Sequence, residues 1–152
     1  AITEADKFQH KLNNSIRKGA GTVAGILGEY AFCEAIRGGA RRQNTYDWDV
    51  AFHGATFDVK TKVRSASTKL SYVGSVNTLN GKQKCDYYSF VSINKKLTKA
   101  HVMGYIPSDL FFNVATFFKK GDLNVTKQFR QHCDVYDIEY RDLYSVKELG
   151  NK

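Results

Sequence analysis

Two alternating segments on either side of a short turn restrict the fold more than any other feature of the sequence. Residues 46–52 and 57–63 alternate side chains strictly between two faces, which is the period of a β-strand. His53 and Gly54 between them suit a tight turn, so we predict an antiparallel hairpin. Its more apolar face would carry Tyr46, Trp48, Val50, Phe52, Phe57, Val59, Thr61 and Val63.

Before the hairpin, the sequence is typical of a long helix. We expect this helix over residues 4–37, with a break near 19–21 because glycines interrupt the pattern there. Gly38 and Gly39 would end it. After the hairpin, residues 65–85 are polar and rich in turn-forming residues, which predicts a long loop.

The second half of the chain alternates between extended and helical patterns. We expect strands at 87–93, 101–106 and 135–140, and helices at 107–115 and 141–149. The sequence contains no internal repeat and no linker, and its length suits one domain. The predicted fold is a single α/β domain over residues 1–152, with a central mixed β-sheet flanked by helices and an α-β-β-β order at the start.

Composition limits the classes of function. The formal net charge is +8, which favours a polyanionic partner such as nucleic acid, although basic residues can also form an ordinary solvated face. No apolar stretch is long enough to cross a bilayer, so we expect no membrane partner. The odd number of cysteines, without a CxxC spacing, favours free thiols in a reducing compartment. We therefore expect a cytoplasmic protein.

The second face of the predicted hairpin carries charged residues. Pairing through the two-residue turn sets Asp49 opposite Asp58 and Asp47 opposite Lys60. Two carboxylates facing each other repel, which sheets normally avoid, so a cation should lie between them. A divalent cation with oxygen ligands, such as Mg²⁺, is the natural candidate.

Lys60 adds a positive group beside the two carboxylates. It lies two residues after Asp58, on the same face and about 7 Å further along the strand. An ammonium group there can orient a metal-activated water or stabilise negative charge on a phosphate. The structural alternative is that these charges form the solvated face of an ordinary hairpin.

Glu29 supplies a third acidic group on the predicted helix. It is at helical spacing from Ile26, Cys33 and Ile36, which would direct its carboxylate toward the sheet. An inward-facing glutamate must be paired or bind a metal. A rival stripe of Leu27, Tyr30 and Glu34 would instead turn Glu29 away from the sheet.

These elements together resemble the PD-(D/E)XK nuclease superfamily, the restriction-endonuclease-like fold. The resemblance is carried by Gly28-Glu29-Tyr30-Ala31-Phe32, Tyr46-Asp47-Trp48-Asp49 and Asp58-Val59-Lys60-Thr61-Lys62. That superfamily places one acid on the first helix, an aspartate on one strand and (D/E)-x-K on the next. The proline of its name is absent here, which leaves the strand aspartate open between Asp47 and Asp49; cross-strand pairing favours Asp49.

The resemblance implies a Mg²⁺ site, with Mn²⁺ as a substitute. Asp49, Asp58, the carbonyl group of Val59 and Glu29 would be its ligands, and Asp47 is the alternative ligand. Lys60 would orient or activate the nucleophilic water. Later segments resemble short phage or marine phage-like nuclease proteins, which implies a host-cytoplasmic location if the chain is phage-encoded. By analogy with nucleases of this fold, a homodimer is also expected.

The resulting expectation is a DNA nuclease that hydrolyses phosphodiester bonds with a metal-activated water. Whether such an enzyme would be an endonuclease or an exonuclease is left open. The alternatives are a non-cleaving, basic nucleic-acid-binding module on the same fold, and a structural protein with a charged hairpin. The cations expected to contact the phosphates of nucleic acid are Arg41, Arg42, Lys62, Arg64 and Lys84.

Overall fold

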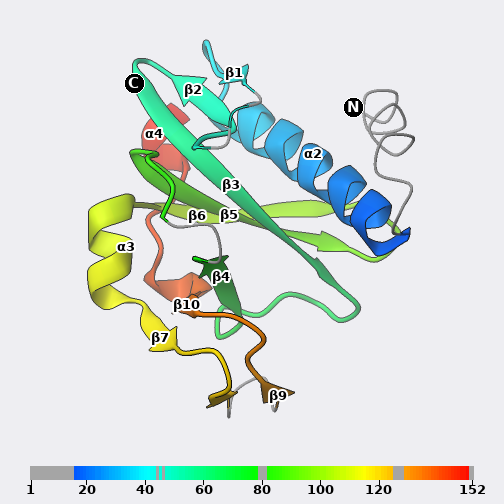
Figure 1. Cartoon of the computed structure of the whole chain (residues 1–152). Coiled ribbons are helices and arrows are strands. Elements are labelled where there is room, and N and C mark those ends of the chain that lie inside the picture. Colours follow the sequence, from blue (N-terminus) through cyan, green and yellow to red (C-terminus); the bar gives the residue numbers. More distant parts are fainter. Residues whose placement is uncertain (1–15, 44, 46, 79–81, 125–128, 151–152) are drawn as a thin grey trace.

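The fold is α/β, built around a five-stranded mixed sheet (Figure 1). The computed structural model describes residues 16–43, 45, 47–78, 82–124 and 129–150. The described strands are β1 (Arg41–Arg42), β2 (Val50–Phe52), β3 (Ala55–Arg64), β4 (Val73–Asn77), β5 (Tyr87–Asn94), β6 (Ala100–Pro107), β7 (Thr116–Phe118), β8 (Leu123–Asn124), β9 (Phe129–Arg130) and β10 (Val135–Glu139). The described helices are α2 (Ile16–Ile36), α3 (Ser108–Val114), the 3₁₀ turn η1 (Tyr140–Asp142) and α4 (Lys147–Gly150).

The central sheet has the strand order β1-β2-β3-β5-β6. β2 and β3 form the predicted antiparallel hairpin, whereas β3 and β5 are parallel along the whole of β5. Parallel neighbours need a long connection between them, and residues 65–86 provide it. β5 then pairs antiparallel with β6, which completes a mixed sheet as predicted.

Different elements cover the two faces of this sheet (Figure 1). α2 crosses one face, where Phe32 and Ile36 pack with Phe57 and Val59 in a core that α4 also joins. The other face is covered by α3 and by a three-stranded sheet of order β4-β10-β7. The prediction of flanking helices is thus correct for the first face, whereas a second small sheet shares the other face with α3.

α2 runs through the glycines that were expected to interrupt it. It extends without a break from Ile16 to Ile36, so the predicted break near 19–21 is wrong. Packing of α2 against the sheet, for example at the buried Gly28, outweighs the intrinsic helix cost of glycine. Gly28 lies directly against β3, where an added Cβ would come 1.9 Å from Thr61 Oγ1. The helix ends as predicted before Gly38 and Gly39, which both have positive φ angles.

The turn of the hairpin was predicted correctly, but the first strand was not. His53 and Gly54 have φ angles of 49° and 81°, as a tight hairpin turn with two positive φ values requires. Val50 pairs with Phe57, which is the predicted register. The strand expected at 46–52 begins only at Val50, because the preceding segment makes local turn hydrogen bonds instead.

Two further elements differ from the sequence predictions. The expected loop 65–85 contains a strand, β4, which pairs with β10 some sixty residues later in the chain. The helix expected over 141–149 is replaced by η1 and the short α4. Between them, Tyr144 forms a β-bridge with Tyr105 of β6, and this pairing replaces helical hydrogen bonds.

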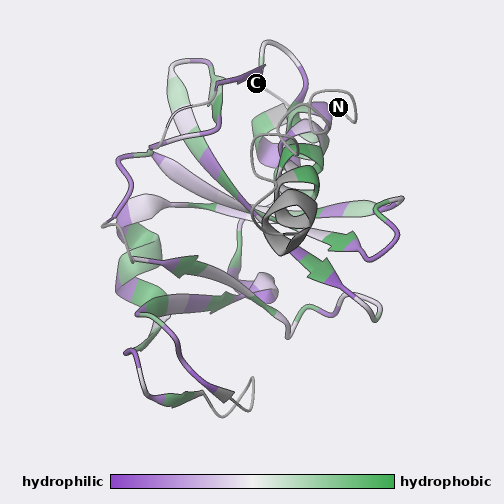
Figure 2. Ribbon diagram, turned by 45° about the vertical axis from the view of Figure 1, so that its right-hand side comes forward, coloured by the Kyte–Doolittle hydropathy of each residue, from purple (hydrophilic) through white to green (hydrophobic). Residues whose placement is uncertain are grey.

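The β8–β9 pair lies apart from the central sheet and from α2 (Figures 1 and 2). Colouring by hydropathy shows apolar segments on α2 and α3, the two helices that pack on the central sheet (Figure 2). Among the described residues, no helix is both long and apolar enough to span a membrane. The three cysteines are free thiols, as predicted.

Candidate active site

β3 positions the two residues on which the predicted site depends. The side chains of a strand alternate between faces, and Phe57 and Val59 are packed against α2. Asp58 and Lys60 therefore emerge on the opposite face, toward β4 and α3. Asp58 is only 3% exposed, which is rare for a carboxyl group unless it is paired or hydrogen-bonded.

Asp49 lies next to Asp58 at the entry of the hairpin. Its backbone N–H donates to the carbonyl group of Phe57 (2.8 Å), which fixes the chain just before β2 starts. Its carboxylate Oδ2 accepts a hydrogen bond from the backbone N–H of Val59 (2.8 Å). Asp49 is thus held across the hairpin from Asp58, as the register predicts.

The electrostatic environment of Asp49 is unfavourable to a negative charge. Burial raises the pKa of Asp49 to about 8, and the negative charges of Asp58 and Glu29 contribute to the same shift. A hydrogen bond between the Asp49 and Asp58 carboxyl groups is a smaller contribution to this shift, and the hydrogen bond from the Val59 N–H opposes it. Two carboxyl groups share one largely buried space, so a cation between them would remove the repulsion.

Besides Asp49, Asp58 contacts Gln83 and Lys60. Its Oδ1 accepts a hydrogen bond from the side-chain amide of Gln83 (2.8 Å), and its Oδ2 lies 2.8 Å from the ammonium nitrogen of Lys60. The Lys60 side chain is 31% exposed, compared with 4% for Asp58, so the ion pair opens toward solvent on the lysine side. A ligand could approach the carboxylate from that side.

The wall behind Asp58 is formed by buried polar groups. Burial is the main cause of the raised pKa values of the Cys85 thiol and the Tyr88 hydroxyl, and the nearby Asp58 charge contributes to both shifts. Ser108 donates a hydrogen bond to the carbonyl group of Cys85 (2.8 Å). Both Cys85 and Tyr88 are protonated at neutral pH, so neither adds negative charge to the site.

Glu29 faces the hairpin side of α2 but is already paired. Its Oε1 accepts a charge-assisted hydrogen bond from Arg42 Nε (2.9 Å), and both side chains are largely buried. The Arg42 guanidinium also lies 4.8 Å from the centre of the Tyr30 ring. The stripe containing Ile26 and Ile36 is buried, as the sheet-facing orientation of Glu29 required.

The remaining predicted ligands have other environments. Asp47 Oδ1 accepts a hydrogen bond from the backbone N–H of Lys84 (3.0 Å), so Asp47 supports the 82–86 segment and does not face Lys60 as predicted. Val59 is buried in β3 between Asp58 and Lys60. Among the residues that the structure describes, no group of three or more His, Cys, Asp or Glu side chains could hold a metal ion. The close carboxyl pair is therefore Asp49 and Asp58, without Glu29.

The five cations expected to bind nucleic acid fall into two groups. Arg41 and Lys84 have exposed side chains. Lys62 donates to Ser75 Oγ (2.7 Å), and Ser75 in turn donates to the buried Asp137 (2.5 Å). Arg64 and Arg42 likewise have protein partners.

Arg64 shows why such assignments are difficult from sequence. Its Nη2 donates to the carbonyl group of Val73 (2.8 Å) and to the Tyr140 hydroxyl (3.0 Å). Its guanidinium also lies over the Tyr72 ring, 4.9 Å from the centre. These contacts join β3 to β4 and η1, so the Arg64 guanidinium group contributes to the stability of the fold.

Two residues of the site were missed by the sequence analysis. Gln83, which contacts Asp58, lies in a polar segment with no distinguishing pattern. Arg42 was expected to bind nucleic acid, and nothing in its sequence spacing indicated a partner on α2. None of the known protein-family models matches this chain, and a comparison with curated proteins gives no match either.

Proposed function

We propose that this protein is a Mg²⁺-dependent nuclease with a restriction-endonuclease-like core, hydrolysing DNA phosphodiester bonds by a metal-activated water. The observation that carries the proposal is the Asp49–Asp58 pair, two largely buried carboxyl groups in contact across the hairpin with Lys60 beside them. Hard oxygen donors around one point suit Mg²⁺, which takes few protein carboxylates and keeps several waters. The net charge of +8 further favours a polyanionic substrate.

The residues around the carboxyl pair have different roles in this proposal. Asp49 and Asp58 would hold the metal, with the Val59 carbonyl group as a further ligand and Glu29 acting directly or through water. The Val59 N–H orients Asp49, and Gln83 orients Asp58. Bound Mg²⁺ would lower the pKa of a coordinated water and neutralise the scissile phosphate. Lys60, whose side chain is more exposed than that of Asp58, would orient that water or stabilise the developing charge.

A second candidate function has its own supporting observation. Glu29 is neutralised by Arg42, and Asp58 by Lys60. A site whose charges are internally balanced in this way also suits a basic module that binds nucleic acid without cleaving it. The two candidates differ in one respect: the nuclease requires the Asp49–Asp58 pair to take up a divalent cation, whereas the binding module does not.

The test is cleavage of a panel of plasmid, linear duplex, single-stranded, branched DNA and RNA substrates. Each substrate is incubated with Mg²⁺, with Mn²⁺ and with EDTA, beside the variants Asp58→Ala and Lys60→Ala. The proposal expects metal-dependent cleavage that both substitutions abolish. The preferred substrate would then identify the kind of nuclease.

The controls use the same residue types away from the site. Lys69 and Asp109 are exposed, so Lys69→Ala and Asp109→Asn should retain the wild-type rate. Cleavage that survives both Asp58→Ala and Lys60→Ala would come from a contaminant and would refute the site. Salt-sensitive binding without any cleavage would favour the non-cleaving module instead.

A further inference from the structure

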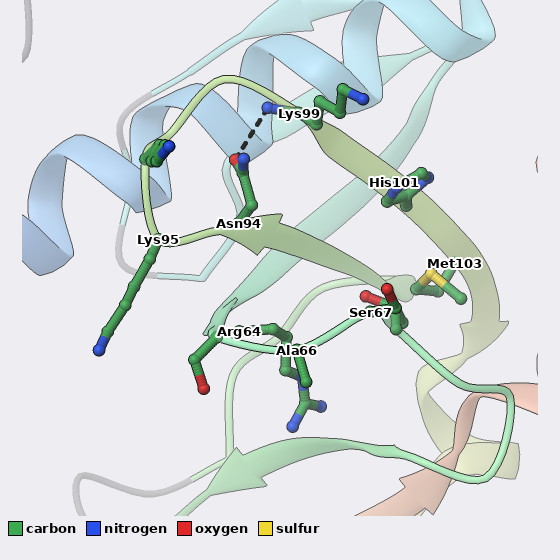
Figure 3. A pocket seen from close by; sticks show the side chains of 11 residues that line it. Arg64, Ala66, Ser67, Asn94, Lys95, Lys99, His101 and Met103 are labelled. Carbon is green, nitrogen blue, oxygen red and sulfur yellow. Dashed lines mark hydrogen bonds between the residues drawn. The ribbon is translucent and has the colours of Figure 1, made fainter.

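A cavity of about 670 Å³ opens at the end of β3 that is remote from the hairpin turn (Figure 3). It is lined by Arg64 and residues 65–68 after β3, by Asn94 at the end of β5, and by Lys95, Lys96 and Lys99 in the turn that follows. Arg64 follows Asp58 and Lys60 by an even number of residues in β3, so its side chain emerges on the same face of the sheet. It follows Lys60 by four residues, which is about 13 Å along the strand.

The turn that supplies the lysines has a defined conformation. Asn94 ends β5, and its side-chain oxygen accepts hydrogen bonds from the backbone N–H groups of Thr98 (2.8 Å) and Lys99 (2.9 Å), the second of which is drawn in Figure 3. The backbone N–H of Lys95 donates to the Arg64 carbonyl group (3.1 Å), which joins the turn to the end of β3. The lysine backbones are thus fixed, and their side chains remain exposed.

The charges around the cavity have one sign. Lys95, Lys96 and Lys99 are exposed, and their ammonium groups form no ion pair with any residue that the structure describes. None of the lining residues is acidic. Hydroxyl groups from Ser65 and Ser67 add hydrogen-bond donors to the lining, and the Thr68 hydroxyl shares a hydrogen bond with Ser92 (2.6 Å). Clustered cations without a counter-charge on the protein attract an external anion.

We propose that this cavity binds the phosphate backbone of a nucleic acid, at a position separate from the Asp49–Asp58 pair. The proposed ligand, a nucleic acid, is also the substrate class of the proposed function. In this respect the inference rests on the proposed function. Lys62 and Arg64, which lie between Lys60 and the cavity on this strand, contact β4, so a nucleic acid that joins the two positions would pass over β4. The cavity would hold the nucleic acid in place while the other end of β3 contacts a different phosphate.

The lining also indicates which part of the nucleic acid is contacted. Proteins that read or stack single-stranded bases use aromatic platforms, and no Phe, Tyr or Trp is among the residues lining this cavity. Lysine and hydroxyl groups bind phosphate and sugar, which positions a nucleic acid without reading its sequence. Binding here should therefore be independent of sequence and strongly dependent on salt.

The experiment measures binding of a fluorescent duplex of mixed sequence by anisotropy, in EDTA so that cleavage is blocked. The test variant is Lys95→Ala/Lys96→Ala, and the matched control is Lys119→Ala/Lys120→Ala. Both are adjacent exposed lysine pairs, and the hydrogen bonds described for these lysines are made by their backbone groups, including those of Lys119 and Lys120 to the carboxylates of Asp122 and Asp134. Both substitutions remove two charges, so a general loss of positive charge would affect them equally. Melting curves establish that both variants are folded.

The inference expects the Lys95→Ala/Lys96→Ala variant to bind roughly tenfold more weakly, with the slope of log affinity against log salt reduced by about 1.8. The control should bind like the wild type. Equal affinities in the two variants would overturn the inference. A loss of inorganic phosphate binding without any loss of duplex binding would also overturn it, because the cavity would then serve a free anion.

These outcomes are separable from those of the proposed function. Weakened duplex binding in EDTA would support the cavity even if the protein cleaved no substrate. Metal-dependent cleavage with unchanged binding in the Lys95→Ala/Lys96→Ala variant would refute the cavity and leave the nuclease intact.

Discussion

The regions at the two ends of β3 carry opposite kinds of charge. Near the hairpin turn, Asp58 is almost fully buried beside Asp49, in an environment that raises the pKa of Asp49 to about 8. At the other end, Lys95 and Lys96 are exposed and have no acidic partner among the described residues. One end retains buried charge at a cost in stability, whereas the other exposes charge at little cost.

This difference fits the two tasks that we propose. Buried, mutually repelling carboxyl groups do not stabilise a fold, so their arrangement favours a bound cation. Exposed lysines contribute almost nothing to folding and attract polyanions from a distance. The carboxylate end is therefore suited to chemistry and the lysine end to holding a nucleic acid. The predictions below separate the two ends.

The largest effect is expected at the carboxylate end. Asp58→Asn should lower the rate of metal-dependent cleavage by at least about 100-fold, because a neutral amide cannot hold the metal or balance Lys60. The same variant should bind duplex DNA in EDTA as tightly as the wild type. Single-turnover cleavage and anisotropy measure the two properties. A parallel loss of both would show that the two ends do not act separately.

At the lysine end, a substitution should weaken substrate binding and leave the rate of the chemical step unchanged. Lys99→Ala should raise the substrate concentration needed for half-maximal cleavage about threefold, since each lysine contributes to phosphate binding alone. The maximal rate should remain unchanged, and Lys120→Ala should alter neither parameter. Initial rates over a range of duplex concentrations would show this. A reduced maximal rate would place Lys99 in the chemical step.

The sequence predicted the carboxylate end better than the lysine end, for a physical reason. A hairpin is local, so alternation and the His53-Gly54 turn were sufficient to pair Val50 with Phe57 and set Asp49 beside Asp58. The cavity lined by Lys95, Lys96 and Lys99 lies where β3 and β5 pair in parallel. This pairing places residues some thirty positions apart next to each other. No local pattern encodes that neighbourhood.

The same limit explains the errors in the fold. β4 was expected to be loop because residues 65–85 are polar and rich in turn-forming residues, and β10 stabilises this strand from far along the chain. The hairpin strand was overextended at its start, where Thr45 Oγ1 accepts a hydrogen bond from the Trp48 N–H (2.9 Å) and forms a turn. Local side-chain hydrogen bonds there compete with strand pairing.

Glycine-to-alanine substitutions in α2 test whether this helix supports the carboxylate end of β3. Gly28→Ala should lower the free energy of unfolding by roughly 1–3 kcal/mol, because its Cβ would come 1.9 Å from Thr61 Oγ1. Gly25→Ala has no atom within 4 Å of the added group, so it should gain up to about 1 kcal/mol from better helix propensity. Urea denaturation compares them. Equal effects would mean that α2 does not press on β3 at this point.

A separate effect concerns the pH dependence of stability in the metal-free protein. The pKa of Asp49 rises from an ordinary 3.8 to about 8 on folding, so the folded state holds a proton that the unfolded state loses. Stability from this group should therefore fall as pH rises from about 4 to 8 and level off above 8. Asp49→Asn should remove that part of the slope in melting temperatures measured in EDTA. An unchanged slope would contradict the buried carboxyl pair.

The central claim is that Asp49 and Asp58 together bind a divalent cation. The most direct measurement is a Mn²⁺ titration of the whole protein, with free Mn²⁺ followed by electron paramagnetic resonance, for the wild type, Asp49→Asn, Asp58→Asn and Asp109→Asn. We predict one site in the wild type and in Asp109→Asn, and its loss in both other variants. Absence of the site in the wild type, or its survival in Asp49→Asn and Asp58→Asn, would contradict the account.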